Sequence, residues 1–291
     1  MIAIRTVLCP VDFSPATTRQ VDVAADLCRA FGARLVLHHN VNSMGTVAAV
    51  GWMWRADHPH SSPDRVGEQL HEQLARVSAG LESEARITQG PPSRTVLDTI
   101  DAVGADLVVL STHALARDDH ASITEQVLST GRRAVLALHD EHVEHHTPHF
   151  ASVAGDRQIV LVPTDLTPES RAAVDLGLDL ARRLPVDLHL LHLLPEGSHK
   201  RQDYTGLAAQ ARFELGALVP AEFAARVRLH VEDGDPAAGI LRVAQAISAD
   251  CIVMGEHTRA PLRRWLSKDT SRAVLREAPC PVWYIPGRRA A

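Results

Sequence analysis

The feature that most constrains this chain is an internal repeat. Residues 6–41 correspond without a gap to residues 159–194, at an offset of 153. The two segments read TVLCPVDFSPATTRQVDVAADLCRAFGARLVLHHNV and IVLVPTDLTPESRAAVDLGLDLARRLPVDLHLLHLL. Residues 89–113 match residues 233–257 at an offset of 144, so the middle of the first repeat is 9 residues longer (153 − 144). A duplication of this length predicts two domains of the same fold.

Length and composition agree with two globular domains. The 291 residues allow each half to bury its own core. A hydrophobic fraction of 45% with 22% charged residues is typical of a soluble protein, and no apolar run reaches the ~18 residues of a membrane span. The net charge of −5 gives no field that would attract nucleic acid or an acidic membrane. The first residues lack the pattern of a signal peptide, so a cytoplasmic location is expected.

The four cysteines predict buried thiols. Cys9, Cys28, Cys251 and Cys280 lie in apolar or helical contexts, and no two of them form a CxxC pair. This pattern favours reduced cysteines over a disulfide framework or a zinc site.

Strand-length apolar runs alternate with helical periodicity in both repeats. The strands expected in the first repeat are residues 5–11, 34–41, 106–110 and 134–138, and the helices are 21–31 and 94–103. The strands expected in the second are 159–163, 187–194, 251–254 and 282–285, and the helices are 169–183, 236–248 and 270–277. Strands that alternate with helices need crossover connections, which give parallel pairing. Each repeat is therefore predicted to be an α/β domain.

A histidine-rich linker separates the repeats. We expect domains at residues 1–139 and 158–291, with residues 140–157 between them, because HDEHVEHHTPHFASVAGDR has no apolar periodicity. A solvated tether is the simplest interpretation. The alternative is a metal site, for which the candidate ligands are His142, His145, His146 and His149.

The extra residues of the first repeat include an aromatic cluster. Trp52, Met53 and Trp54 lie in the segment 42–63. Exposed aromatic residues mark interfaces, so this loop is a candidate lid or partner-binding patch. Alternatively, it folds back over the sheet edge or the neighbouring domain.

In an open α/β sheet, ligands bind at the carboxyl ends of the strands where the strand order reverses. The residues that follow the first strand of each repeat are Asp12 and Asp165. Those that follow the fourth strand are 111–114, Ser-Thr-His-Ala, and 255–258, Gly-Glu-His-Thr. These positions form the candidate binding edge.

Both halves resemble the universal stress protein family in its tandem form. The matching segments are VLCPVDFSPAT and VLVPTDLTPES at the first strands, GDPAAGILRVAQAISADCIVMGEH at the fourth, and VLREAPCPVWYIP at the end. The resemblance implies two tandem Rossmann-like domains of the adenine nucleotide alpha hydrolase-like kind, each a five-stranded parallel sheet flanked by helices. It also implies that the terminal strands at 134–138 and 282–284 pair, so that the fusion supplies its own dimer.

Members of this family that bind ATP are similar in a loop of Gly, two residues, Gly, nine residues, Gly, then Ser or Thr, with an Asp facing the adenosine. Glycines let backbone N–H groups approach phosphates. By this resemblance the cofactor-binding positions are Asp165, Gly255, His257 and Thr258, with Asp12 in the first repeat. Thr258 replaces the second glycine, which weakens the nucleotide-binding pattern.

The closing Gly-Ser pair of that loop is replaced by Lys268-Asp269. A carboxylate ~4 Å from a phosphate, at an effective dielectric of ~20, gives repulsion on the order of 4 kcal/mol. Asp269 suits instead the N-cap of helix 270–277. A cationic stretch argues in the opposite direction and comprises Arg259, Arg263, Arg264 and Lys268.

The first repeat departs further from the pattern. Ser111 and Ala114 replace the first two glycines, and Asp118 and Asp119 lie within a loop that is three residues shorter. If either half binds a nucleotide, the second half is the better candidate.

Acid–base pairs are conceivable at Asp12 with His39 and at Asp165 with His192. No nucleophile accompanies them, because Ser14 and Thr167 precede a proline and suit a helix cap or turn. The sequence therefore favours binding over turnover and assigns no catalytic residue.

Three functions follow from these observations. The first is a stress-response binding protein with degenerate nucleotide loops. The second is an ATP-dependent switch with slow hydrolysis in the second domain. The third is a scaffold that recruits a protein partner through the loop of Trp52, Met53 and Trp54.

Overall fold

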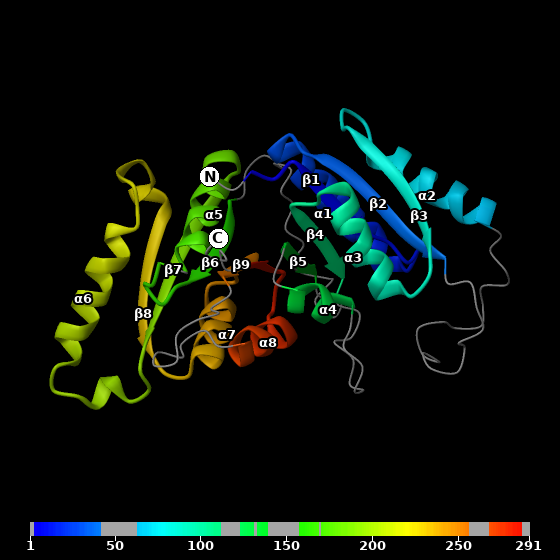
Figure 1. Cartoon of the computed structure of the whole chain (residues 1–291). Coiled ribbons are helices and arrows are strands. Elements are labelled where there is room, and N and C mark those ends of the chain that lie inside the picture. Colours follow the sequence, from blue (N-terminus) through cyan, green and yellow to red (C-terminus); the bar gives the residue numbers. More distant parts are fainter. Residues whose placement is uncertain are drawn as a thin grey trace. The chain divides into compact units, whose positions relative to one another are not determined.

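The computed structural model describes residues 3–41, 63–111, 123–130, 133–138, 157–168, 170–255 and 268–286. The chain forms two compact units (Figure 1). One unit is Ile4–Val109, and the other contains Leu110–Ala291 with Met1–Ala3. The boundary between the units therefore precedes the end of the first repeat.

The unit Ile4–Val109 is built on a parallel sheet with strand order β3-β2-β1-β4. Its elements are β1 (Thr6–Pro10), α1 (Pro15–Phe31), β2 (Arg34–Val41), α2 (Pro63–Val77), β3 (Ser83–Gln89), α3 (Pro92–Val103) and β4 (Leu107–Ser111). The first strand lies inside the sheet, and the chain adds strands on both of its sides. This reversal of strand order is the place where an open sheet offers a binding crevice.

The second unit repeats this arrangement, with strand order β5-β10-β9-β6-β7-β8. Its first elements are α4 (Ile123–Thr130), β5 (Ala134–Leu138), β6 (Gln158–Pro163), α5 (Arg171–Arg183), β7 (Val186–Leu194) and the 3₁₀ turn η1 (Ser198–Lys200). The remaining elements are α6 (Tyr204–Ala217), the 3₁₀ turn η2 (Ala221–Arg226), β8 (Val227–Asp233), α7 (Pro236–Ala246), β9 (Cys251–Gly255), α8 (Lys268–Glu277) and β10 (Val282–Ile285).

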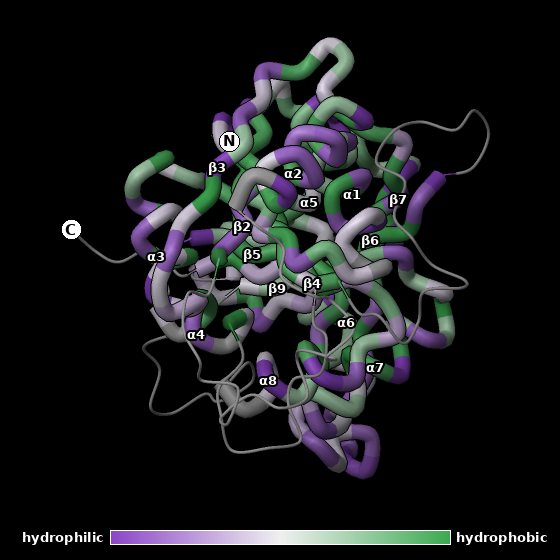
Figure 2. Tube along the Cα trace, turned by 90° about the vertical axis from the view of Figure 1, so that its right-hand side faces the viewer, coloured by the Kyte–Doolittle hydropathy of each residue, from purple (hydrophilic) through white to green (hydrophobic). Residues whose placement is uncertain are grey.

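The central strands form because they are apolar on both faces. Every residue of β5, β9 and β10 is buried, as expected for strands covered by helices on both sides. Figure 2 shows hydrophobic residues concentrated among the strands. Burying a large aliphatic side chain contributes ~1.5–3 kcal/mol, so each of these strands stabilises the fold through its apolar residues.

Helix boundaries follow from local signals. Proline occupies the first turn of α1, α3 and α7, where its missing N–H is harmless. The first two of these helices end at Gly32 and Gly104, with φ of 65° and 62°. Glycine adopts this left-handed conformation without a steric penalty, so the chain turns there into the next strand.

Strand β5 pairs antiparallel with β10, with Leu136 opposite Trp283. The terminal strands of the two repeats therefore pair, as the family resemblance implied. Pairing is parallel for β1 with β2 and β4, for β2 with β3, for β6 with β7 and β9, for β7 with β8, and for β9 with β10. Because β5 pairs with β10, the last strand of the first repeat belongs to the second compact unit.

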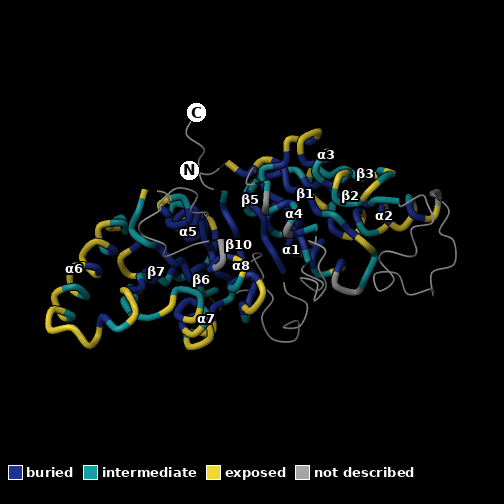
Figure 3. The backbone as a smooth tube through the Cα atoms, turned by 60° about the horizontal axis from the view of Figure 1, so that its bottom comes forward, coloured by how far each residue is buried: buried dark blue, intermediate teal, exposed yellow. Residues whose placement is uncertain are grey.

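The predicted strands and helices are present, with ends that shift by a few residues. The predicted helix 21–31 begins earlier, at Pro15, because the turn before it ends sooner than expected. Five helices and strands were not predicted, namely α2, β3, α4, α6 and β8, and neither were the two 3₁₀ turns. Strands β3 and β8 are largely half-exposed, and Figure 3 shows long exposed stretches along α6, so their apolar periodicity is weak. Among the described helices, none is both long and apolar enough to cross a membrane.

Candidate functional site

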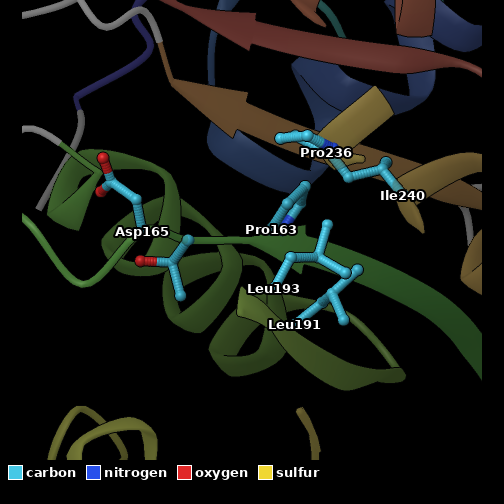
Figure 4. Close-up of a pocket in the computed structure, with 7 residues that line it drawn as sticks. Pro163, Asp165, Leu191, Leu193, Pro236 and Ile240 are labelled. Atoms are coloured by element: carbon cyan, nitrogen blue, oxygen red, sulfur yellow. The ribbon is translucent and has the colours of Figure 1, made fainter. Parts of the chain in front are cut away.

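A hollow of about 240 Å³, open to solvent, lies at the carboxyl end of β6 in the second unit. Its lining comes from the ends of two neighbouring strands and from the first turns of α7 (Figure 4). The lining residues are Pro163, Thr164, Asp165, Leu191, Leu193, Pro236 and Ile240. Five of these seven side chains are apolar, so the hollow is hydrophobic, with Thr164 and Asp165 at its polar margin.

The apolar wall follows from strand and helix geometry. Leu191 and Leu193 alternate along β7 and therefore point to the same face of the sheet. Helix α7 is fixed over this face because Asp235 caps it, accepting a hydrogen bond of 2.9 Å from the Ala238 N–H. A Cβ at Gly239 would lie 2.7 Å and 2.9 Å from the two terminal methyl carbons of Leu193. Glycine at 239 thus allows the helix to approach the wall.

Asp165 stands at the polar margin of the hollow. Figure 4 shows its carboxylate directed away from the apolar side chains. Its Oδ1 accepts hydrogen bonds from the Thr167 N–H at 3.0 Å and the Thr167 hydroxyl at 2.6 Å. These bonds form a tight turn in which Leu166 has a φ of 65°. Thr167 therefore acts as a turn residue, as its place before Pro168 indicated.

The first repeat contains the same turn. Asp12 Oδ1 accepts from the Ser14 N–H at 2.9 Å and from the Thr17 hydroxyl at 2.5 Å, and Phe13 has a φ of 60°. A bulky residue in the left-handed region is a strained conformation that costs about 1–3 kcal/mol. Both repeats keep this strain directly after the aspartate, where it fixes the carboxylate at the sheet edge.

His39 and His192, which the sequence suggested as acid–base partners of these aspartates, each hydrogen-bond a backbone carbonyl. His39 Nδ1 lies 2.8 Å from the Val11 carbonyl oxygen, and His192 Nδ1 lies 2.9 Å from the Thr164 carbonyl oxygen. Burial lowers the pKa of His39 below its usual 6.5. In both repeats the ring nitrogen closest to the aspartate strand is engaged by a carbonyl. This geometry supports a structural role for the histidines.

The corresponding surface of the first repeat is polar. His38 and Asn40 stand where the second repeat has Leu191 and Leu193. His38 Nε2 lies 2.7 Å from the Thr88 hydroxyl oxygen, and the Asn40 side-chain N–H donates to the Gly90 carbonyl at 2.8 Å. Burial lowers the pKa of His38 to about 4, so this ring is neutral near pH 7. The two copies have diverged in the chemistry of their binding edge.

The structure separates the predicted site residues into three groups. Asp165 lines the hollow, and Gly255 ends strand β9, which neighbours β6. Asp12 lies at the equivalent edge of the other unit. His257 and Thr258 lie outside the described residues, as do Arg259, Arg263, Arg264, Asp118 and Asp119. Helix α8 begins at Lys268, so Asp269 lies in its first turn and is not the N-cap that the sequence suggested.

Six of the seven lining residues were missed by the sequence reasoning: Pro163, Thr164, Leu191, Leu193, Pro236 and Ile240. A signal existed for four of them. The two leucines alternate in the strand that follows the aspartate strand, and Pro236 and Ile240 are four residues apart on one helix face. Apolar residues at such positions also suit a core, so residue type alone could not identify them.

The cysteines are buried and free, as predicted. Burial raises the pKa of Cys28 and of Cys251 to about 12, and it raises the pKa of Cys9 and Cys280 as well. Thiols with such pKa values are protonated and unreactive near pH 7. The described residues contain no cluster of three or more metal-ligating side chains. The histidines at 142, 145, 146 and 149 and the loop at 52–54 lie outside the described residues.

Doubly wound α/β units with a binding edge beside the first strand define a class of tandem Rossmann-like proteins. The sequence model of the universal stress protein family matches residues 3–139 and 156–286. The chain therefore belongs to the universal stress protein family and carries two copies of its domain.

Solved structures and a curated relative are consistent with this family. A universal stress protein from Archaeoglobus fulgidus has a TM-score of 0.65 at 19% identity, covering 97% of this chain and 96% of that one. A putative universal stress protein from Pseudomonas aeruginosa gives 0.62 at 18% identity, covering 97% and 93%. A universal stress protein from Methanocaldococcus jannaschii is 26% identical over 141 residues, which are 43% of this chain and 80% of that protein.

Proposed function

We propose that this chain is a stress-response binding protein in which the hollow beside Asp165 takes a small heterocyclic ligand such as a nucleoside, without turning it over. The observation that carries the proposal is the apolar wall of the hollow next to an aspartate fixed at the sheet edge. An apolar wall suits the face of a flat heterocycle. A carboxylate at the sheet edge is a hydrogen-bond acceptor that suits a ligand hydroxyl.

The hollow at Asp165 is shallow, because its volume of about 240 Å³ includes open solvent. Leu191, Leu193 and Ile240 are buried, so a ligand here would lie over the edge of this apolar cluster and keep part of its surface in solvent. A small nucleoside suits such an edge better than a triphosphate, which would also need the loop after β9. In that loop Thr258 replaces a glycine, and Lys268-Asp269 replaces the closing Gly-Ser pair.

The second repeat is the better binding half. Its wall at Leu191 and Leu193 is apolar, whereas the first repeat has His38 and Asn40 in these places. His38 is already buried, and both side chains are hydrogen-bonded within the unit, so this edge of the first repeat offers no apolar wall to a ring. We therefore assign one ligand of this type to each chain.

The test is calorimetric titration of adenosine into the wild-type protein, Gly239→Ala and Gly206→Ala. The added methyl at 239 pushes Leu193 into the hollow, so adenosine affinity should fall at least tenfold. The contacting atoms are the ends of a flexible side chain, so the fold should survive. Gly206 has open space around it and serves as the matched control, with unchanged affinity. Equal affinity in all three proteins would refute the site, and absence of adenosine binding to the wild type would refute the ligand class.

The rival is an ATP-dependent switch in the second domain. In this hypothesis the ligand lies at the same sheet edge, but the loop after β9 also binds its phosphates. It therefore predicts that ATP binds much more tightly than adenosine and is slowly hydrolysed. The scaffold hypothesis predicts that deletion of residues 52–54 abolishes capture of a protein partner while adenosine binding persists.

A further inference from the structure

A pair of histidines lies on the sheet of the second unit, outside the hollow. His189 is on β7 and His230 is on the edge strand β8. His189 Nδ1 and His230 Nε2 are 2.9 Å apart, and the ring planes differ by 20° with centroids 5.0 Å apart. Both rings are half-buried, so solvent reaches them.

The two rings converge because of strand register. Leu191 is the direct cross-strand neighbour of His230 on the parallel pair β7 and β8. His189 lies two residues before Leu191 and shares its face of the sheet. His230 and His189 are thus diagonal neighbours. The first repeat has Val36 and Arg86 at the aligned positions, so the pair is specific to the second repeat.

The separation of the two nitrogens fits a chelated metal ion. Imidazole nitrogens bind divalent transition metals at ~2.0–2.1 Å, so a spacing of 2.9 Å corresponds to an angle of ~90° at the metal. This is the cis angle of square-planar and octahedral coordination, which Cu²⁺ and Ni²⁺ adopt with nitrogen ligands.

We propose that His189 and His230 form a two-histidine site for Cu²⁺ or Ni²⁺, with water completing the coordination sphere. The inner nitrogens, Nδ1 of His189 and Nε2 of His230, are the ligands. Without metal, one inner nitrogen carries a proton and donates it to the other. When the metal binds, that proton is exchanged through solvent to the outer nitrogen of the same ring, so neither imidazole changes its charge.

The experiment uses the full chain with the linker histidines 139, 142, 145, 146 and 149 changed to glutamine, which removes the densest group of other histidines. In this background, Cu²⁺ titration followed by electron paramagnetic resonance should give a signal split by two imidazole nitrogens. His189→Gln or His230→Gln should remove that signal and lower the affinity at least tenfold. His71→Gln, an exposed histidine on α2, is the matched control and should change nothing.

A second measurement does not depend on the folding of any variant at the pair. This measurement uses the same variant, in which the five linker histidines are glutamine. In ¹H–¹⁵N spectra of its histidine rings, sub-stoichiometric Cu²⁺ should broaden the His189 and His230 resonances before those of the other rings. The proposal is overturned if other histidines broaden first. It is also overturned if folded His230→Gln protein binds Cu²⁺ with the same stoichiometry and affinity as its parent.

Discussion

At the scale of single residues, the two repeats share the aspartate turn but differ in the residues beside it. The aspartate turn recurs with a strained left-handed residue at Phe13 and at Leu166. On the second strand of each repeat, the aligned positions are polar in the first repeat, at His38 and Asn40, and apolar in the second, at Leu191 and Leu193. The aspartate turn at the candidate binding edge is thus the same in both repeats, whereas the aligned residues on the neighbouring strand differ in polarity.

His38 gives the first repeat a pH dependence. Its pKa in the folded protein is about 4, against 6.5 for an ordinary histidine, because burial disfavours the charged ring. The unfolded chain therefore binds more protons than the folded chain between these pH values. The contribution of His38 to stability is complete above pH 6.5 and decreases as the pH falls towards 4.

We therefore expect the free energy of unfolding to decrease between pH 6.5 and pH 4, and to decrease less steeply in His38→Gln. Glutamine can still hydrogen-bond Thr88 but does not titrate. Denaturant unfolding at several pH values in this interval measures both slopes. An unchanged slope in the variant would show that His38 is already charged in the folded protein or is not buried.

The candidate site could be predicted only in part from single residues. The position of Asp165 after a buried strand and before a Thr-Pro turn was sufficient to place it at the sheet edge. The apolar residues of the hollow were not distinguishable from core residues, because leucine on a buried strand has the same signature in both settings. Their role depends on the close approach of α7 at Gly239, which is a tertiary contact.

At the scale of elements, prediction succeeded where burial is complete and failed at the edges. Strands β1, β6 and β9 are continuous apolar runs bounded by turn residues, and each was expected close to its observed position. Strands β3 and β8 carry charged residues on half-exposed faces, which masks the alternation of a strand. Helix α6 contains two glycines and exposes Phe213, so its apolar residues do not form one stripe.

Two glycines on helices should respond in opposite directions to the same change. Gly104→Ala forces a Cβ into the left-handed C-cap of α3 and should lower the free energy of unfolding by about 1–2 kcal/mol. Gly206→Ala, within α6 and with open space around it, should raise that free energy by about 0.5–1 kcal/mol. Denaturant midpoints at constant m-value measure both changes. A shift of the same sign in the two variants would contradict the helix boundaries.

At the scale of the whole molecule, the sequence repeat and the compact unit do not coincide. The repeat ends after β5, but β5 pairs with β10, so a strand of the first repeat belongs to the unit of the second. Strand pairing thus links the two repeats within one compact unit. The family resemblance predicted this pairing of terminal strands, whereas the repeat alone did not, because two similar segments do not show which strands pair.

Cutting the tether should therefore not separate the two parts. With a protease site placed within residues 140–157, the cleaved chain should still elute as one species in gel filtration. Leu136→Ala removes a fully buried side chain opposite Trp283 and should cost about 2–5 kcal/mol, so the cleaved variant should dissociate more readily. Separation of the cleaved wild-type parts at micromolar concentration would mean that strand pairing does not join them.

The central claim is that the hollow at Asp165 binds a small ligand without a loop that binds phosphates. The most direct measurement is the ratio of the dissociation constants of adenosine and ATP for the wild-type protein, determined by calorimetry in the same buffer with Mg²⁺. We predict a ratio within threefold of one and no release of phosphate from ATP. ATP binding at least tenfold tighter than adenosine, or steady phosphate release, would contradict this claim and favour the ATP-dependent switch.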